Sequence, residues 1–218
     1  MKSTKKGRQQ PIFWIVAGPN GSGKSTVYGR NDVAGLDGSV WFINPDLLTV
    51  RIQEAEGLEL TSANLAAVQR IETWLEASLD AHQTIGVETV LSSPKYRRLV
   101  TKAQQLGFKV HFIYVILHDV QMQLDRIRVR VEKGGHDVPA DKVESRRSRS
   151  IVQALWFMDQ ADRFWVFDNS GAELGLIGEG DGEEASFSSK APADFLAAVE
   201  WGWSEGLGPE EIQERLSP

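Results

Sequence analysis

The sequence predicts an α/β fold in which helices sandwich a parallel β-sheet. Short apolar runs alternate with segments of helical periodicity, and this alternation is typical of a parallel sheet covered by helices. A glycine-rich segment also lies where the first strand would give way to a helix, and α/β proteins bind phosphate groups at such a place. The strand-like runs are residues 13–17, 40–43, 85–90, 110–117 and 164–167.

Helices are expected between these strands from apolar spacing and end signals. Leucine, valine and isoleucine recur at helical spacing after the capping candidates Thr61 and Ser62. Ser93 and Pro94 are suited to the start of a further helix, and Gly107 is suited to its left-handed end. These signals predict one helix before the 110–117 strand and another before the 85–90 strand.

Two arginine-bearing helices are predicted around a glycine pair. Residues 121–133 form the first, Gly134 and Gly135 interrupt the pattern, and residues 138–149 form the second. This arrangement resembles a hinged lid. Towards the end of the chain, a turn is expected at residues 178–182.

The remaining organisation follows from length and composition. A chain of 218 residues with 41% hydrophobic residues fits one domain, with a core at about residues 11–170, a lid at about 125–150 and a C-terminal appendage at 171–218. Terminal helices are expected at 193–202 and 209–216. The chain has no cysteine and no apolar run near 18 residues, so we expect a soluble, cytoplasmic protein without a membrane partner.

Charge is distributed unevenly along the chain. The net charge of −6 argues against broad nucleic-acid binding. The arginine-rich segment 126–149 nevertheless suits a polyanionic ligand such as ATP. The alternative for any one of these arginines is a solvated helix face with acidic partners.

The glycine-rich segment Gly18-Pro-Asn-Gly-Ser-Gly-Lys-Ser25 matches the phosphate-loop pattern G-x-x-x-x-G-K-[ST]. In that pattern the backbone N–H groups converge on phosphate oxygens, the lysine contacts the β- and γ-phosphates, and the serine hydroxyl binds Mg²⁺. We therefore expect Lys24 to be catalytic and Ser25 to be the metal ligand. The alternative is an ordinary glycine-rich loop. The candidate nucleotide-binding residues are Gly18, Pro19, Asn20, Gly21, Ser22, Gly23, Lys24, Ser25 and Thr26.

Three acidic residues lie at or just beyond the carboxyl ends of predicted strands, where α/β proteins gather their ligands. Asp46 would face the glycine-rich loop and serve as the base for an acceptor hydroxyl, or else it caps a helix. Glu88 would position the acceptor or, through water, the metal, or else it pairs with a neighbour at the strand edge. Asp168 would lie near the purine, or else it forms a turn with Asn169 and Ser170.

One or two lid arginines are expected to stabilise the negative charge that develops during phosphoryl transfer. The candidates are Arg126, Arg128, Arg130, Arg146, Arg147 and Arg149. The histidines, His82, His111, His118 and His136, show no spacing typical of a metal site.

Taken in order, several motifs resemble the zeta toxin group of P-loop kinases, which is related in architecture to chloramphenicol phosphotransferase. The resemblance runs from about residue 13 to residue 170. It is carried by the glycine-rich loop, by Ile43-Asn-Pro-Asp-Leu-Leu48, by Glu88-Thr89, and by Arg130-Val-Glu-Lys-Gly-Gly-His-Asp-Val-Pro139 followed by Arg146.

This resemblance implies transfer of the ATP γ-phosphate to the 3′-hydroxyl of UDP-N-acetylglucosamine. It implies that Asp46 is the base, that Glu88 and Thr89 hold the acceptor, and that Arg130 and Arg146 contact the phosphates. ATP and Mg²⁺ are then the cofactors, and an antitoxin protein is an implied partner.

Two other functions are alternatives to a small-molecule kinase. One is an ATP-gated interaction module without kinase activity. The other is a polynucleotide 5′-kinase, which the seven tryptophans would permit as stacking surfaces. The surroundings of Trp156, Phe157, Phe164 and Trp165 favour core packing for these aromatic residues instead.

Overall fold

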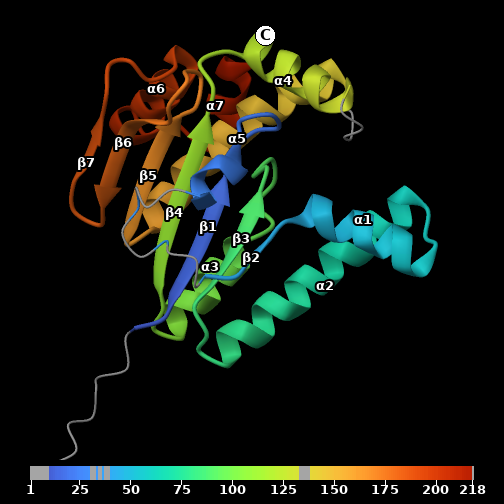
Figure 1. The fold of residues 1–218 in the computed structure, drawn as a ribbon. Helices are drawn as coiled ribbons and strands as arrows, with labels where there is room; N and C mark the ends of the chain where they lie inside the picture. The colour runs from blue at the N-terminus through green and yellow to red at the C-terminus, as the bar shows by residue number, and fades with distance from the viewer. Residues whose placement is uncertain (1–9, 30–32, 34–35, 37–39, 133–137, 218) are drawn as a thin grey trace, which may run out of the picture.

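A seven-stranded sheet forms the centre of the computed structural model, which describes residues 10–29, 33, 36, 40–132 and 138–217 (Figure 1). The strand order is β2-β3-β1-β4-β5-β6-β7. The first five strands run parallel, and β6 and β7 are antiparallel additions at one edge. The α/β class predicted from the sequence is therefore confirmed. The strands are β1 (Ile12–Ala17), β2 (Phe42–Ile43), β3 (Ile85–Thr89), β4 (Lys109–Ile116), β5 (Arg163–Asp168), β6 (Gly175–Asp181) and β7 (Ala185–Phe187).

Helices connect and cover these strands. The segment after β1 is a 3₁₀ helix, η1, and a π-helical turn, η2, follows α6. The helices are η1 (Lys24–Gly29), α1 (Pro45–Glu56), α2 (Leu60–Asp80), α3 (Arg97–Gln105), α4 (Val120–Glu132), α5 (Ala140–Gln160), α6 (Ala193–Val199), η2 (Glu200–Ser204) and α7 (Pro209–Leu216). None of the helices described here is long and apolar enough to span a lipid bilayer.

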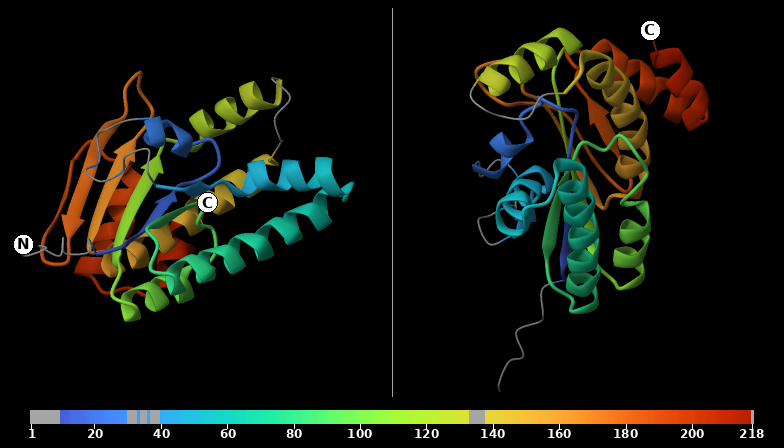
Figure 2. Two further views of the ribbon diagram at one scale, coloured as in Figure 1. Left: turned by 60° about the horizontal axis from the view of Figure 1, so that its bottom comes forward. Right: turned by 90° about the vertical axis from the view of Figure 1, so that its right-hand side faces the viewer.

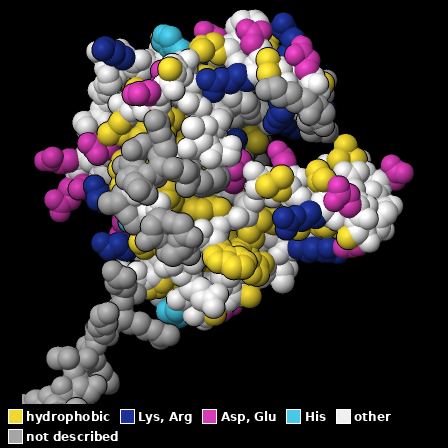
Figure 3. Space-filling model, in the orientation of Figure 1, with side chains coloured by type: hydrophobic (Ala, Val, Ile, Leu, Met, Phe, Trp, Pro, Cys, Tyr) yellow, Lys and Arg dark blue, Asp and Glu magenta, His cyan; other side chains and the backbone are white. Residues whose placement is uncertain are grey.

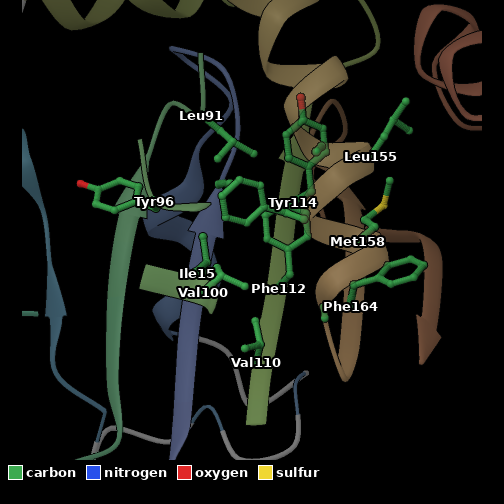
Figure 4. Packing of buried hydrophobic residues seen from close by; sticks show 14 of the residues in the cluster. Ile15, Leu91, Tyr96, Val100, Val110, Phe112, Tyr114, Leu155, Met158 and Phe164 are labelled. Atoms are coloured by element: carbon green, nitrogen blue, oxygen red, sulfur yellow. The ribbon is translucent and has the colours of Figure 1, made fainter. Parts of the chain in front are cut away.

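The two faces of the sheet are buried by different material, because alternate residues of a strand point to opposite faces. Phe13, Ile15 and Ala17 of β1 pack with residues of α2, α3, α5, α6 and α7 in the larger core. Figure 4 shows part of this core between β1, β4 and α5. Trp14 and Val16 pack on the other face, where Val27, Val33 and Leu36 cover them. The edge-on view in Figure 2 shows the long helices on one side of the sheet.

The predicted helix starts at residues 61–62 and 93–94 were wrong. Helix α2 begins at Leu60 after Glu59, so Thr61 and Ser62 lie inside its first turn. Helix α3 begins at Arg97, because the chain first makes a turn closed by a hydrogen bond from the Arg97 N–H to the Pro94 carbonyl. The left-handed conformation expected for Gly107 is confirmed, with φ at 78°.

The two arginine-bearing helices are confirmed as α4 and α5. The expected glycine break at Gly134 and Gly135, together with His136, lies outside the described residues. Helix α5 continues eleven residues past the expected end at 149, to Gln160. Its second half is apolar and buries Ile151, Phe157 and Met158 against the sheet.

Residues 171–217 include two strands of the same sheet and helices that pack into the same core. The turn expected at 178–182 was misplaced, because residues 175–181 form β6. The would-be Cβ atoms of Gly178 and Gly180 lie 2.5 Å from the rings of Phe187 and Phe164, so these glycines make room for packed aromatic rings. The hairpin turn follows Asp181, whose Oδ1 accepts hydrogen bonds from the Glu183 and Glu184 N–H groups. Helix α7 matches the predicted terminal helix at 209–216.

The strand order also locates the ligand site. Strand β1 lies between β3 and β4, so the connections leaving the sheet diverge on either side of it. In open parallel sheets this divergence leaves a crevice at the carboxyl ends of the strands. The glycine-rich loop leaves β1 at that crevice.

Candidate active site

A cleft of about 440 Å³ lies at the carboxyl ends of β1, β2 and β3. Figure 3 shows the molecular surface hollowed between the α4 region and the arm formed by α1 and α2, with Lys and Arg side chains on the α4 side. The cleft brings together most of the residues that the sequence singled out. It is lined by Asn20, Gly21, Gly23, Lys24, Ser25, Asn44, Pro45, Asp46, Glu88, Thr89, Val90, Lys95, Tyr96, Arg126 and Arg130.

The glycine-rich loop is held too tightly for side chains at its glycines. Gly21 and Gly23 have φ of 77° and 81°, in the left-handed region that favours glycine. A Cβ on Gly23 would lie 2.1 Å from Asn169 Nδ2, and a Cβ on Gly21 would lie 2.9 Å from the Gln123 carbonyl oxygen of α4. Asn169 Nδ2 also donates to the Ser22 carbonyl at 2.9 Å. The loop is thus fixed from two sides, by α4 and by the segment after β5.

Lys24 is the cation buried in this loop. Its Nζ donates to the carbonyl oxygens of Gly18 at 2.8 Å and Pro19 at 3.3 Å. Burial lowers the pKa of Lys24, while the negative charges of Glu88 and Asp46 raise it and Arg130 lowers it further. The ammonium group therefore lies in a site where an added anion would favour its charged form.

The opposite wall of the cleft comes from β2 and β3. These strands pair in parallel with Ile43 opposite Val87, which places Asn44 and Glu88 next along the two chains. Asn44 Nδ2 donates to Glu88 Oε2 at 3.1 Å. Asp46 follows two residues later, in the first turn of α1.

The alternative interpretation of Asp46 as a helix cap was wrong, because Asn44 is the cap. Asn44 Oδ1 accepts hydrogen bonds from the N–H groups of Asp46 at 2.9 Å and Leu47 at 3.2 Å. Pro45 occupies the first helical position. The Asp46 side chain, which caps nothing, is exposed and lines the cleft.

The structure divides the six arginines into three groups. Arg126 and Arg130 of α4 line the cleft. Arg146 of α5 lies beside the loop and donates to Asn20 Oδ1 at 3.3 Å. The other three point elsewhere: the buried Arg147 forms an ion pair with the half-buried Asp194 at 2.7 Å, and Arg128 and Arg149 are exposed.

Asp168, like Arg146, is a candidate that does not line the cleft. Its Oδ1 accepts hydrogen bonds from the N–H and the hydroxyl of Ser170, which closes a turn after β5. The neighbouring residue Asn169 contacts the loop instead, and its carbonyl accepts a hydrogen bond from Arg126. Gly18, Pro19, Ser22 and Thr26 are also absent from the lining, and Gly18 and Pro19 contribute their carbonyl oxygens to Lys24.

Sequence reasoning missed four residues of this region. Asn44 and Asn169 act through tertiary contacts that no local pattern shows. Lys95 and Tyr96 line the cleft from the loop before α3, where the Lys95 ammonium lies 4.9 Å from the centre of the Tyr96 ring. The loop that holds Lys95 and Tyr96 directly follows the strand that ends with Glu88 and Thr89, which were already candidates. This position could have marked the loop as part of the site.

Metal-binding groups are sparse in this cleft. Among residues 10–29, 40–132 and 138–217, no cluster of three or more His, Asp or Glu side chains is gathered. The exposed Ser25 hydroxyl and the carboxylates of Asp46 and Glu88 are among the oxygen-bearing side chains that line the cleft and could bind a hard cation.

Fold and cleft together define a P-loop kinase-like protein: a parallel sheet with β1 central, a glycine-rich loop after it, and a lysine inside that loop. The chain belongs to the AAA domain family, whose model matches residues 13–151.

The chain is also similar to an uncharacterized protein of Haemophilus influenzae, with 29% identity over 139 residues, covering 64% of this chain and 93% of that protein. The fold is similar to a chain of the AvrRxo1-ORF1:AvrRxo1-ORF2 complex, solved with sulphate ions (TM-score 0.64, 16% identity, covering 97% of this chain and 77% of the other). A structure of the same complex with ATP gives a TM-score of 0.63 at 17% identity, with the same coverage.

A further similar fold comes from the PezAT chromosomal toxin-antitoxin system of Streptococcus pneumoniae. It has a TM-score of 0.61 at 16% identity and covers 98% of this chain and 88% of the other. The resemblance to P-loop kinases of the zeta toxin group is thereby confirmed for the fold. Family and fold support nucleotide binding and nucleotide-dependent phosphotransfer in general.

Proposed function

We propose that this protein transfers the γ-phosphate of ATP to a hydroxyl group of a small molecule, with UDP-N-acetylglucosamine as the first acceptor to test. One observation carries the proposal. A buried lysine in a glycine-rich loop lines the same cleft as two carboxylates, one from the end of β3 and one from the first turn of α1. Phosphoryl transfer needs these two kinds of group on opposite sides of the transferred phosphate.

The donor side is assigned to the loop. Backbone N–H groups of residues 18–26 would receive the phosphates, and Lys24 would exchange its carbonyl partners for phosphate oxygens. Ser25 would hold Mg²⁺, which neutralises phosphate charge when it is bound. Arg130, on the cleft wall, and Arg146, beside Asn20, would stabilise the charge on the transferred phosphoryl group.

The acceptor side is assigned to the β2–β3 wall. Asp46 would accept the proton of the attacking hydroxyl, because it is solvent-accessible and its oxygens are not used as a helix cap. Glu88 and Thr89 would hold the acceptor beside it. We also propose that Asp168 lies near the base of the nucleotide. It would contribute there by closing the turn with Ser170.

The choice of UDP-N-acetylglucosamine rests on the sequence motifs shared with zeta toxins and on the similarity of the fold to a PezAT structure. The same two arguments make an antitoxin the proposed protein partner. The lid formed by α4 and α5 and cytoplasmic placement remain parts of the proposal.

The test is incubation of the purified chain with γ-labelled ATP, Mg²⁺ and a panel of acceptors. The panel holds UDP-N-acetylglucosamine, unphosphorylated sugars, dinucleotides and a 5′-hydroxyl oligonucleotide. A labelled sugar nucleotide is the expected product. Label on the oligonucleotide alone would replace the proposal with a polynucleotide kinase, and binding of ATP without any labelled acceptor would favour an ATP-gated interaction module.

A further inference from the structure

We propose that Asn44 is a positioning residue that fixes both carboxylates of the acceptor wall through one side-chain amide. This inference rests on the proposed function for the roles of Asp46 and Glu88. It goes beyond the proposed function by assigning the placement of these carboxylates to Asn44, a residue of the 43–48 motif for which the sequence implied no role.

The orientation of the amide is set by its partners. Asn44 Oδ1 faces two backbone N–H groups, those of Asp46 and Leu47, which can only donate. The oxygen must therefore point to the helix, and the Nδ2 group must point to Glu88 Oε2, 3.1 Å away. An inverted amide would oppose donors to donors at one end and acceptors to an acceptor at the other.

The backbone brings these groups together without help from the side chains. The parallel register of Ile43 with Val87 places Asn44 alongside Glu88. Pro45 then fixes the first helical residue, so the Asp46 N–H returns to the Asn44 side chain. One residue thus connects the end of β2, the end of β3 and the start of α1.

Asparagine alone meets both demands. Aspartate and serine cap helices about as well as asparagine. Aspartate has no donor for a carboxylate, and a serine hydroxyl engaged at the helix would not reach Glu88 in the same way. Alanine would lose both contacts. The helix cap and the hydrogen bond to Glu88 can therefore be separated by mutation. Asn44→Ser keeps the cap and removes the hydrogen bond to Glu88, so it tests the proposal.

The first measurement needs no substrate. Urea unfolding of the wild type, Asn44→Ser, Glu88→Ala and the double variant gives the coupling between the two side chains. In the wild type, Asn44→Ser removes a hydrogen bond to a charged acceptor; in Glu88→Ala that acceptor is already gone. We therefore expect the change in the unfolding equilibrium constant caused by Asn44→Ser to be about 10-fold smaller in Glu88→Ala than in the wild type. Asn44→Asp should be less stable than Asn44→Ser, because two carboxylates would then face each other. Additive effects, or equal stability of Asn44→Asp and Asn44→Ser, would overturn the proposal.

The second measurement separates positioning from a general loosening of the α1–α2 arm. Asn64 is an exposed asparagine of the same arm that accepts a hydrogen bond from the Thr49 hydroxyl, and Asn64→Ser is the matched control. With ATP and UDP-N-acetylglucosamine, Asn44→Ser should lower kcat about 10-fold while the KM for ATP stays unchanged, and Asn64→Ser should leave both constants at wild-type values.

An equal loss in Asn64→Ser, or a rise in the KM for ATP that accounts for the loss in Asn44→Ser, would also overturn the proposal. If the wild type does not phosphorylate UDP-N-acetylglucosamine, the acceptor proposed above is wrong. The unfolding cycle then decides the case of Asn44 by itself.

Discussion

The donor side and the acceptor side of the cleft are built in different ways. The donor side is one continuous segment, residues 18–26, whose glycines and lysine act within a few residues of each other. The acceptor side is assembled from the ends of β2 and β3 and from the first turn of α1. A continuous segment can be recognised in the sequence, whereas an assembled wall depends on strand register and tolerates less displacement of its supports.

The largest effect is expected at the donor side. Lys24→Ala removes the buried cation of the loop and should lower transfer by about 10³-fold or more, with weaker ATP binding. Isothermal titration with ATP and a transfer assay measure the two effects. Lys102→Ala, in a surface ion pair with Asp80, is the control and should behave as wild type. If Lys24→Ala bound ATP and transferred phosphate like the wild type, the glycine-rich loop would not be the nucleotide-binding site.

The next effect separates the two sides. Asp46→Asn should lower turnover by about 10²–10⁴-fold, the usual contribution of a general base, while the Kd for ATP stays unchanged. Asp141→Asn changes another acidic residue in the first turn of a helix and serves as the matched control. Unchanged turnover in Asp46→Asn would mean that another group accepts the proton.

A smaller effect tests the support of the acceptor wall. The would-be Cβ of Gly86 lies 2.3 Å from the Phe42 ring, so Gly86→Ala should displace β2 and the residues that follow it. We expect transfer to fall about 10-fold and ATP binding to be retained. Gly182→Ala, where no atom lies within 4 Å of the new Cβ, is the control. If Gly86→Ala lost ATP binding and transfer to the same extent, the donor side and the acceptor side of the cleft would not be independent.

The smallest effect on activity is expected far from the cleft, at His111. This buried ring contacts Trp14 and Trp165, and burial lowers its pKa from 6.5 to about 4. The unfolded chain therefore binds a proton at higher pH than the folded one. The stability due to the neutral ring is complete above pH 6.5 and is lost as the pH falls towards 4, by about 3 kcal/mol in total.

His111→Phe should flatten this part of the pH–stability curve and leave transfer at pH 7.5 unchanged. Urea unfolding at intervals between pH 4 and pH 7 measures it, with the exposed His118→Phe as control. A curve in His111→Phe that still falls as in the wild type would assign the loss to other groups.

The same contrast explains what could be predicted from the sequence. The five parallel strands and the glycine-rich loop were predictable, because apolar runs and glycine spacing are local properties. Asp46 and Glu88 could be chosen as candidates because Asp46 closely follows a strand and Glu88 lies near the end of one. Asn44 could not, since its contact with Glu88 depends on the pairing of Ile43 with Val87.

The antiparallel edge strand β6 was not predicted, for a related reason. Gly178 and Gly180 look like turn residues in the sequence, but they lie in β6 because Phe187 and Phe164 pack across them. Asp168 was placed near the base of the nucleotide by its strand end alone. In the structure the Asp168 side chain closes a turn with Ser170, and it is Asn169 that contacts the glycine-rich loop. Residue spacing alone does not encode these side-chain directions.

Two successive arginines of α5 finally set a limit on movement in this molecule. Arg146 reaches the glycine-rich loop, while Arg147 is buried against Asp194 of α6 and donates to the Leu117 carbonyl at the end of β4. Tilting α5 would separate the buried Arg147 guanidinium from the Asp194 carboxylate and leave a buried charge without its partner. These contacts hold the middle of α5 to α6 and to the end of β4, so within the proposed lid we expect α4 to move more than α5 when a nucleotide binds.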